Sequence, residues 1–390
     1  MLKNYIKTAW RSLKNQRFFS LIKIGGFAFS IAICMLIVLY VKHELSYDKF
    51  YKDANLLFRV VGVVNKDNTV LKGLSLPAPA GATLKEEFPE IIASGRLLTN
   101  PLFGAGTNQV ATTGNAELFS EEGFCFADQA IMDFFPTKTI FGSLSHALDN
   151  PKTIVITKRK AAKLFNGNPI GKRIYLNNDK SNEYSITAVI DDIPTNSNLY
   201  GYDFFMTLSG HEPYEGEKLN WLASNYTTYF KVREGTDIQQ LEKKITKSYI
   251  QDHYKPAIIK AGMTLNEEVW NTARMTLQPL EKIHLYSNDV QTHKIESQNR
   301  GDIRLVYIFG GIALFILIIA MINFINLSTA NAVTRAKEVG VRKTIGSGRK
   351  ALIIQFMTES FLYSGISIVF ALFFAVLLLP FFNNIAGKSL

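Results

Sequence analysis

The sequence predicts α-helical membrane spans combined with one large extracytoplasmic α+β domain. Three observations favour this fold class. Apolar runs long enough to cross about 30 Å of hydrocarbon follow Lys23, Arg304 and Glu359. Strand-like and helical segments are intermixed between the first two runs, and Lys and Arg gather beside the runs.

The positive charge of the chain lies in two short segments. The formal net charge is +10, and residues 1–20 and 328–350 contribute +5 each. Because both segments flank apolar runs, the charge indicates membrane topology and contact with anionic headgroups. Nucleic acid is therefore not an expected partner.

Residues 1–20 predict an amphipathic helix on the cytoplasmic side of the membrane. Leu2, Ile6 and Leu13 repeat at helical spacing, while Lys and Arg occupy the other faces. Such a helix lies along the inner leaflet with Trp10 at headgroup depth, and the lipid bilayer is its partner. A simple basic topogenic tail explains the same charges.

The three apolar runs predict three spans and fix their orientation. The first span, 21–42, could be mistaken for a signal peptide, but it continues into KHELSYDKF without a small-residue cleavage site. The positive-inside rule then places the N-terminus in the cytoplasm. We expect 43–303 outside, a second span at 304–328, a cytoplasmic loop at 329–354, a third span at 355–380 and 381–390 outside.

The region 43–303 is long enough for an α+β domain with its own core. β-Branched runs predict strands at 57–64, 153–157, 184–190 and 227–232. Helical patterns occur at 81–88, 158–165 and 237–250, the last preceded by a capping box of Thr236 and Gln239.

This region offers no pattern typical of an enzyme. Asp191 and Asp192 are adjacent at a strand end, so their side chains point to opposite faces and form no carboxylate pair. The six histidines have no helical metal-ligand spacing, and Cys34 and Cys125 imply no disulfide framework. We expect no catalytic residue, no cofactor and no metal.

The segment Gly346 to Lys350 resembles a phosphate-binding loop only superficially. A Walker A loop needs GxxxxGK[ST] after a buried strand, and neither the spacing nor the strand is present. If ATP drives this protein, another subunit binds it.

The loop 329–354 has the composition of a partner-binding hairpin. Glu338 lies three residues after Arg335 and four before Arg342, which supports a helix, and Gly346 and Gly348 supply a turn. A charged loop that only fixes topology explains the same residues. Four further residues predict helix packing in the membrane through amide or small side chains: Asn323, Asn326, Ser360 and Ser364.

Several stretches resemble a known family. They are the opening MLKNYIKTAWRSLKNQRFFSLIKIGGFAFSIAICMLI, ELSYDKF (44–50), IVITKRKAAKLFNGNPIGKRI (154–174), LQPLEKIHLYS (277–287) and INFINLSTANAVTRAKEVGVRKTIGSGRKALIIQFMTES (322–360). The chain resembles the N-terminal half of the FtsX-like/MacB-like permeases of ABC transporters, in their long Bacteroidetes-type form.

The resemblance implies a MacB-like periplasmic core domain at 43–303 and a bacterial inner-membrane location. It makes 329–354 the contact with a cytoplasmic ABC ATPase. The contact residues that it implies are Arg335, Lys337, Glu338, Val339, Arg342, Lys343, Gly346 and Gly348. Since members need at least four spans, it also implies either a truncated chain or missing spans supplied by another chain, and it implies a second permease half or a homodimer as partner.

Two functions follow from the resemblance. In the first, ATP hydrolysis by the separate subunit moves the periplasmic domain to export or extract a peptide, antibiotic or lipoprotein. In the second, the protein transports nothing and acts as a mechanotransmission scaffold for a periplasmic cell-wall hydrolase or another envelope partner.

Overall fold

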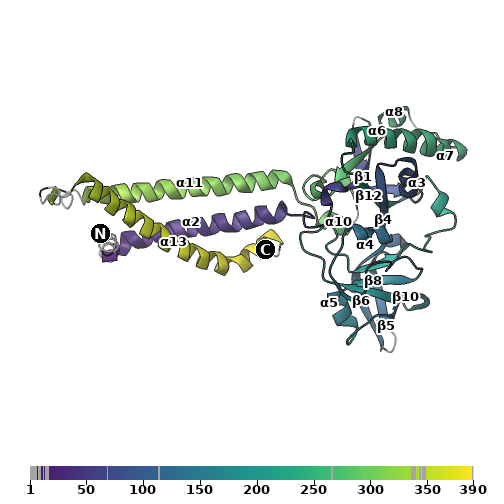
Figure 1. Ribbon diagram of the computed structural model, residues 1–390, viewed down its shortest axis with the longest axis horizontal. Coiled ribbons are helices and arrows are strands. Elements are labelled where there is room, and N and C mark those ends of the chain that lie inside the picture. Colours follow the sequence, from purple (N-terminus) through teal and green to yellow (C-terminus); the bar gives the residue numbers. More distant parts are fainter. Residues whose placement is uncertain are drawn as a thin grey trace. The chain divides into compact units, whose positions relative to one another are not determined.

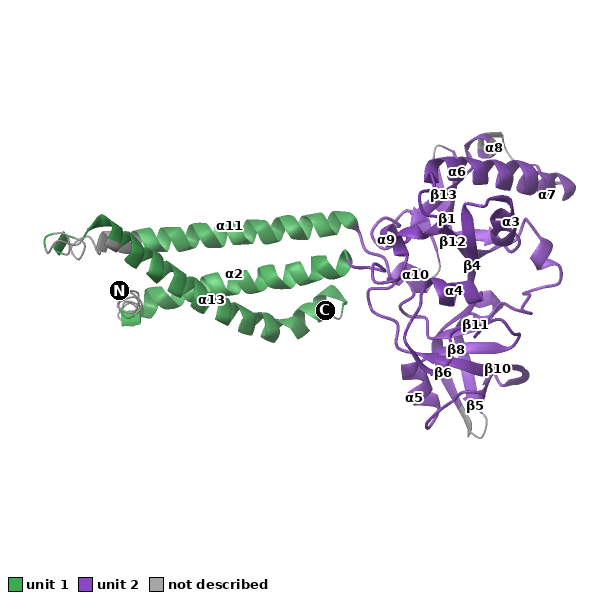
Figure 2. Cartoon of the chain, viewed as in Figure 1, with its two compact units in different colours: residues 1–45, 303–390 green, residues 46–302 purple. Residues whose placement is uncertain are grey.

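The chain forms two compact units, which Figure 2 distinguishes by colour. The computed structural model describes residues 7, 10, 11, 13, 17–67, 69–112, 115–264, 267–292, 294–334, 340, 341, 344, 348–388 and 390. Residues 1–45 and 303–390 make the first unit, here called the helical unit. Residues 46–302 make the second, here called the α+β unit. Most of the predicted N-terminal amphipathic helix lies outside the described residues.

The helical unit consists of long apolar helices. Their bounds are α2 (Arg17–Glu44), α11 (Ile303–Thr334) and α13 (Arg349–Ala386). In the described part of the chain, three helices are long and apolar enough to cross a membrane. Each helix extends beyond its apolar run, because helical hydrogen bonding continues into the polar flanks.

The strands of the α+β unit join one sheet that curls at one end. Its order is β11-β8-β10-β9-β5-β6-β4-β12-β1-β2-β14, with β13 on β1, β3 on β12 and β7 on β10. The first seven strands are β1 (Leu57–Lys66), β2 (Thr69–Gly73), β3 (Ser75–Pro77), β4 (Ile91–Leu98), β5 (Gly106–Thr112), β6 (Asn115–Ala127) and β7 (Thr139–Gly142). The others are β8 (Thr153–Thr157), β9 (Arg173–Leu176), β10 (Asp179–Ile190), β11 (Phe204–Thr207), β12 (Ser224–Val232), β13 (Arg274–Pro279) and β14 (Val290–Gln291).

Part of this sheet closes into a barrel. Strand β11 pairs antiparallel with β8 and parallel with β6, so β6, β5, β9, β10, β8 and β11 form a ring. Even-numbered residues of β8 and β11 belong to the core cluster inside this ring, as Ile154 and Phe204 do. Odd-numbered residues, such as Val155 and Phe205, belong to a second cluster. The barrel strands are therefore buried on both faces.

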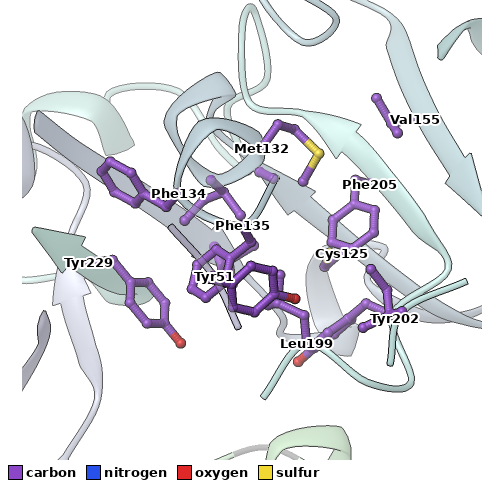
Figure 3. Close-up of a cluster of buried hydrophobic side chains, with 14 of the residues drawn as sticks. Tyr51, Cys125, Met132, Phe134, Phe135, Val155, Leu199, Tyr202, Phe205 and Tyr229 are labelled. Carbon is purple, nitrogen blue, oxygen red and sulfur yellow. The ribbon is translucent and has the colours of Figure 1, made fainter. Parts of the chain in front are cut away.

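The second core cluster covers the outside of the barrel with aromatic side chains (Figure 3). Tyr51 and Phe135 pack edge to face with ring centroids 5.1 Å apart, and Phe135 packs in the same way on Tyr229 at 5.5 Å. Cys125 is fully buried in this cluster. The cluster thus joins the first turn after α2 to the barrel and to the neighbouring strand β12.

Short helices cover the rest of the unit (Figure 1). The α-helices are α3 (Ala80–Glu87), α4 (Gln129–Phe134), α5 (Lys158–Leu164), α6 (Ile238–Lys247), α7 (Lys255–Lys260), α8 (Glu267–Thr272), α9 (Leu280–Ile283) and α10 (Lys294–Gln298). The 3₁₀ turns are η1 (Ala54–Leu56), η2 (Pro101–Phe103) and η3 (Glu217–Leu219). A π-helix, η4 (Ser248–Tyr254), joins α6 to α7.

The start of α6 differs from the prediction. The N-cap is Asp237, whose carboxylate accepts a hydrogen bond from the backbone N–H of Gln240 at 3.1 Å. The predicted capping box of Thr236 and Gln239 is therefore wrong by one residue. A carboxylate satisfies a free helix N–H at least as well as a threonine hydroxyl, so Asp237 takes the capping position.

Candidate functional site

Most of the predicted ATPase-contact residues lie outside the described residues. These are Arg335, Lys337, Glu338, Val339, Arg342, Lys343 and Gly346. Gly348 is described, and it is the N-cap of α13 with extended backbone angles. The loop between α11 and α13 therefore leads directly into the first turn of α13, and its contact role stays a prediction.

Helices α2 and α13 run parallel with a constant register. The hydroxyls of Ser20 and Tyr363 are 2.9 Å apart, and the Ser367 hydroxyl donates to the carbonyl of Ile24 at 3.4 Å. Both pairs are separated by 343 residues in the chain. One turn further along, the fully buried Ala28, Ala32 and Ala371 form a small cluster. Small side chains allow the two helix backbones to approach closely.

Charged side chains are buried at the start of this helix pair. Lys23 on α2 is 6% exposed, and its ammonium lies 5.4 Å from the centroid of the Tyr363 ring. Glu359, one turn before Tyr363 on α13, is 8% exposed. Ionisable groups inside an apolar bundle are costly, and where they occur they usually serve function. This buried polar cluster was not predicted, although Lys23 and Glu359 are the charges that flank two of the apolar runs.

The other end of the same helix pair carries an ion pair. The Lys388 ammonium, just after α13, lies 3.2 Å from a carboxylate oxygen of Glu44, the last residue of α2. The Glu44 side chain is almost fully buried. Helices α2 and α13 are therefore joined by polar contacts at both ends and by alanine packing between them.

Helix α11 packs on another side of α2. The Cys34 thiol donates to the carbonyl of Ala313 at 3.2 Å, and the rings of Tyr40 and Phe309 meet edge to face at 5.3 Å. These contacts place α2 between the other two long helices of the unit.

The four residues predicted to pack helices differ in their surroundings. The side-chain amide of Asn323 lies 3.8 Å from the point that a Cβ on Gly26 would occupy, so it borders the contact with α2. Asn326 is exposed, and Ser360 and Ser364 are half-buried. Their proposed role with a neighbouring membrane helix stays a prediction.

Within the α+β unit, the segment at its start contacts the segment at its end. The chain enters from α2 through the first junction segment, 46–51, and leaves toward α11 through the second junction segment, 284–301. The Tyr47 ring stacks on the His284 imidazole with centroids 3.3 Å apart. His284 Nδ1 lies 2.5 Å from the carbonyl of Asn299, and its own carbonyl accepts from the N–H of Gly301 at 3.0 Å.

The loop 196–200 joins both segments. The N–H of Asp48 donates to the carbonyl of Asn196 at 3.0 Å, and the Asp48 carboxylate accepts from the N–H of Asn198 at 3.0 Å and from its side-chain amide. From the other side, the Asn299 amide donates to the carbonyl of Tyr200 at 2.5 Å. The two junction segments and this loop therefore form one network, here called the junction network.

A buried ion pair fastens strand β1 to the second junction segment. The Arg59 side chain is fully buried, and one of its terminal nitrogens lies 2.7 Å from the Glu296 carboxylate. The other donates to the Gln278 amide oxygen at 2.7 Å and to the Ser287 hydroxyl at 2.9 Å. This pair was not predicted: a charge within the apolar run LFRVVGVV signals that Arg59 needs a buried partner, but not which residue supplies it.

The junction network contains a carboxyl group with an unusual pKa. Burial raises the pKa of Asp48 to about 7, although hydrogen bonds from Asn198 and Ser197 and the charge of Arg59 act in the opposite direction. Burial also raises the pKa of Tyr51, whose hydroxyl lies 2.9 Å from the Ser197 hydroxyl. These groups are structural partners of one another.

Asp191 and Asp192 have structural partners at the start of α5. No group of three or more His, Cys, Asp or Glu side chains among the described residues could hold a metal ion. Asp192 accepts a hydrogen bond from the N–H of Arg159 in the first turn of α5, and Asp191 lies 3.9 Å from Lys158. The two carboxylates therefore stabilise a helix start.

Comparisons with known proteins agree with this architecture. Residues 20–248 match the profile of the MacB-like periplasmic core domain, and residues 310–390 match that of the FtsX-like permease C-terminal region. A comparison with curated proteins gives no match.

Several solved structures are similar to the chain, and three of them follow. A domain of a protein described as a permease from Porphyromonas gingivalis has a TM-score of 0.48 and 20% identity, covering 60% of this chain and 92% of that chain. The periplasmic region of MacB from Actinobacillus actinomycetemcomitans has a TM-score of 0.36 and 11% identity, covering 59% and 91%. The extracellular domain of the ABC-type transporter YknZ from Gram-positive bacteria has a TM-score of 0.35 and 11% identity, covering 57% and 99%.

The family profiles decide the identity of the chain. The first match alone spans more than half of its residues, and the second covers most of α11 and all of α13. The chain therefore belongs to the FtsX-like and MacB-like family of ABC transporter permeases.

Proposed function

We propose that this chain is the permease subunit of a MacB/FtsX-type system in the bacterial inner membrane. A separate cytoplasmic ATPase hydrolyses ATP, and the resulting helix movement displaces the α+β unit on the periplasmic side. That displacement serves the export or extraction of a peptide, antibiotic or lipoprotein. A second permease half or a second copy of the chain completes the assembly.

The junction network is the observation that carries this proposal. Both of its segments are joined directly to a long apolar helix. The first junction segment follows α2, and the second leads into α11. A movement of α2 against α11 therefore pulls on Asp48 from one side and on Asn299 from the other. Since both residues bind the loop 196–200, the movement reaches the α+β unit as a whole.

The contacts of α2 with α13 support transmission of movement from the cytoplasmic loop into the helices. The loop that we assign to the ATPase ends at Gly348, where α13 begins. Tyr363, fifteen residues after Gly348 on α13, contacts Ser20 and Lys23 on α2. A push on the loop is thus passed to α2 through buried polar contacts, without any nucleotide bound to this chain.

Co-purification with an ABC ATPase subunit tests the proposal. We expect the full chain in nanodiscs to bind the ATPase, and we expect Arg335→Ala/Glu338→Ala/Arg342→Ala to weaken that association at least about tenfold, because charge-assisted contacts are lost. The control is Arg173→Ala/Glu183→Ala/Arg233→Ala, which removes the same charges from the α+β unit. Equal binding by both triple variants would show that the loop is not the contact.

A further inference from the structure

A groove lies between α6 and β13 of the α+β unit. It has a volume of about 670 Å³, within the range of about 300–1,000 Å³ that ligand sites occupy. One wall is a stripe of α6 with Gln239, Lys243 and Lys247 at successive four-residue steps, and the opposite side includes Arg274 and Thr276 of β13. Figure 2 shows both elements in the same part of this unit.

The groove carries an excess of unpaired positive charge. Lys243, Lys247 and Arg274 are exposed, and none has an ion-pair partner among the residues that the structure describes. Lys244, next in the helix but turned away from the groove, is paired with Glu90 at 2.7 Å. The acid in the groove lining, Glu242, is already engaged, because it accepts the N–H of Leu277 at 2.7 Å.

The edge of β13 is closed to a further strand. Besides the Leu277 N–H, the N–H of Met275 donates to the Thr246 hydroxyl at 2.9 Å, and that hydroxyl donates to the Met275 carbonyl at 3.3 Å. Strand addition would have to break these three bonds. A ligand in this groove is therefore held by side chains, and apart from Glu242 the charged side chains of the lining are cationic and have no ion-pair partner among the described residues.

The spacing of the cations selects the shape of that ligand. Lys243 and Lys247 are four residues apart on one helix face, or about 6 Å along the axis. Alternate residues of an extended peptide are about 6.6 Å apart and point to the same side. Carboxylates at every second position would therefore meet both lysines, while Arg274 approaches from the strand.

The rest of the lining suits a peptide as well. Gln239, Gln251 and Asn271 carry amide groups that can donate to and accept from a peptide backbone. Ile250 and Met275 add apolar surface below them. Ile250 and Gln251 belong to the π-helix η4, and such insertions occur frequently at functional sites.

We propose that this groove binds an extended acidic peptide segment with carboxylates at alternate positions. The segment belongs to a substrate or partner polypeptide outside the membrane. This inference uses the outward location given by the proposed function, but its test needs neither nucleotide nor ATPase. A result that refutes peptide binding in the groove can therefore be distinguished from a result that refutes coupling to the ATPase.

The test is a binding titration of the full chain in nanodiscs of zwitterionic lipid. The probe is a fluorescein-labelled peptide of alternating Glu and Ala, and the reference is the same peptide with Gln in place of Glu. We expect fluorescence anisotropy to show binding of the Glu peptide alone, weakening as salt is raised. Lys243→Gln/Lys247→Gln/Arg274→Gln should weaken it at least about tenfold.

The control removes charge from the same region without touching the groove. Lys244→Gln/Lys260→Gln should bind the Glu peptide like the parent chain, and exposed substitutions of this kind leave stability nearly unchanged. Three results would overturn the proposal: equal binding of the Glu and Gln peptides, unchanged binding by the groove variant, or equal loss in the control variant. Binding of phosphatidylglycerol vesicles but not of the Glu peptide would also overturn it, because it assigns the cations to a lipid surface.

Discussion

The charge of Arg59 lies in the interior of the α+β unit, where an unpaired guanidinium would be very costly. Its contacts with Glu296, Gln278 and Ser287 supply the compensation, and every one of them comes from the last part of the unit. The pair thus holds β1, near the incoming chain, against the outgoing chain. At the scale of single residues, this pair ties β1 to the second junction segment.

Removing one partner of this pair should strongly destabilise the α+β unit. We expect Glu296→Gln to lower its free energy of unfolding by about 3–5 kcal/mol, because Arg59 remains buried without a counter-charge. Glu183→Gln, which breaks the exposed pair with Arg173, should cost no more than about 1 kcal/mol. The measurement is maleimide labelling of the fully buried Cys125 in denaturant, and similar costs for both variants would contradict the burial argument.

Asp48 should make the stability of the same unit depend on pH. Its pKa rises from 3.8 to about 7 on folding, so the folded chain binds this proton more tightly than the unfolded chain. The stabilising contribution of the protonated form is complete below about pH 4 and is lost as the pH rises through about 7. Wild type should therefore lose stability relative to Asp48→Asn between about pH 4.5 and about pH 7.5.

Calorimetric melting of both proteins across this range measures the effect. His211, whose pKa burial lowers to about 4, changes stability in the opposite direction, but it does so in both proteins and cancels in the difference. A gap between wild type and Asp48→Asn that stays constant with pH would show that Asp48 is ionised in the folded unit throughout.

At the scale of elements, the N-cap of α6 can be tested by mutation. The structure assigns Asp237 as the N-cap, whereas the sequence predicted Thr236, one residue earlier. Asp237→Ala should reduce stability by about 1 kcal/mol, because the N–H of Gln240 loses its acceptor. Thr236→Ala should change it by no more than about 0.5 kcal/mol. Thermal unfolding of the full chain compares the two variants, and the reverse order of effects would restore the capping box of Thr236 and Gln239.

The contact of α2 with α13 should tolerate no enlargement at its alanines. Ala371→Leu places a larger side chain against Ala28 and Ala32, and overpacking of this kind costs about 1–3 kcal/mol. Val376→Trp, at an exposed position of the same helix, adds similar volume and should be nearly neutral. The half-buried thiol of Cys34 on α2 reports the result through its rate of maleimide labelling on heating. Equal rates in both variants would rule out a close contact at Ala371.

Local sequence patterns predicted those strands and helices that can be recognised within a short window of residues. The run TIVIT was predicted as a strand, and it is β8, buried on both faces because Ile154 and Val155 face different clusters. The barrel was not predicted. Its closing strand β11 pairs with β6, some eighty residues earlier, and β6 contains Glu and Gly that obscure its pattern. Closure is a property of long-range pairing that no short window contains.

The contacts of the candidate site were likewise predictable only where the residues are close in the sequence. Glu338 and Arg342 could be proposed as contact residues because their spacing within one loop is local information. Arg59 and Glu296 are 237 residues apart, so neither sequence neighbourhood indicates the pair. Lys23 and Glu359 were noticed only as the borders of apolar runs, since their burial arises from the register of α2 against α13.

At the scale of the whole molecule, charge and connectivity support one direction of signalling. Half of the net charge lies in residues 328–350 and half in residues 1–20, which the positive-inside rule assigns to the cytoplasm. The α+β unit is attached to the apolar helices through both junction segments. In our proposal, force enters at the charged loop and is received by the junction network.

Hydrogen exchange in the assembled complex tests this central claim most directly. The full chain is bound to its ATPase in nanodiscs and compared without nucleotide and after trapping with ATP and vanadate. Our account predicts that exchange at 46–51 and 284–301 changes on trapping, and that Arg335→Ala/Glu338→Ala/Arg342→Ala abolishes the change. Unaltered exchange in both segments, while the ATPase demonstrably retains nucleotide, would contradict it.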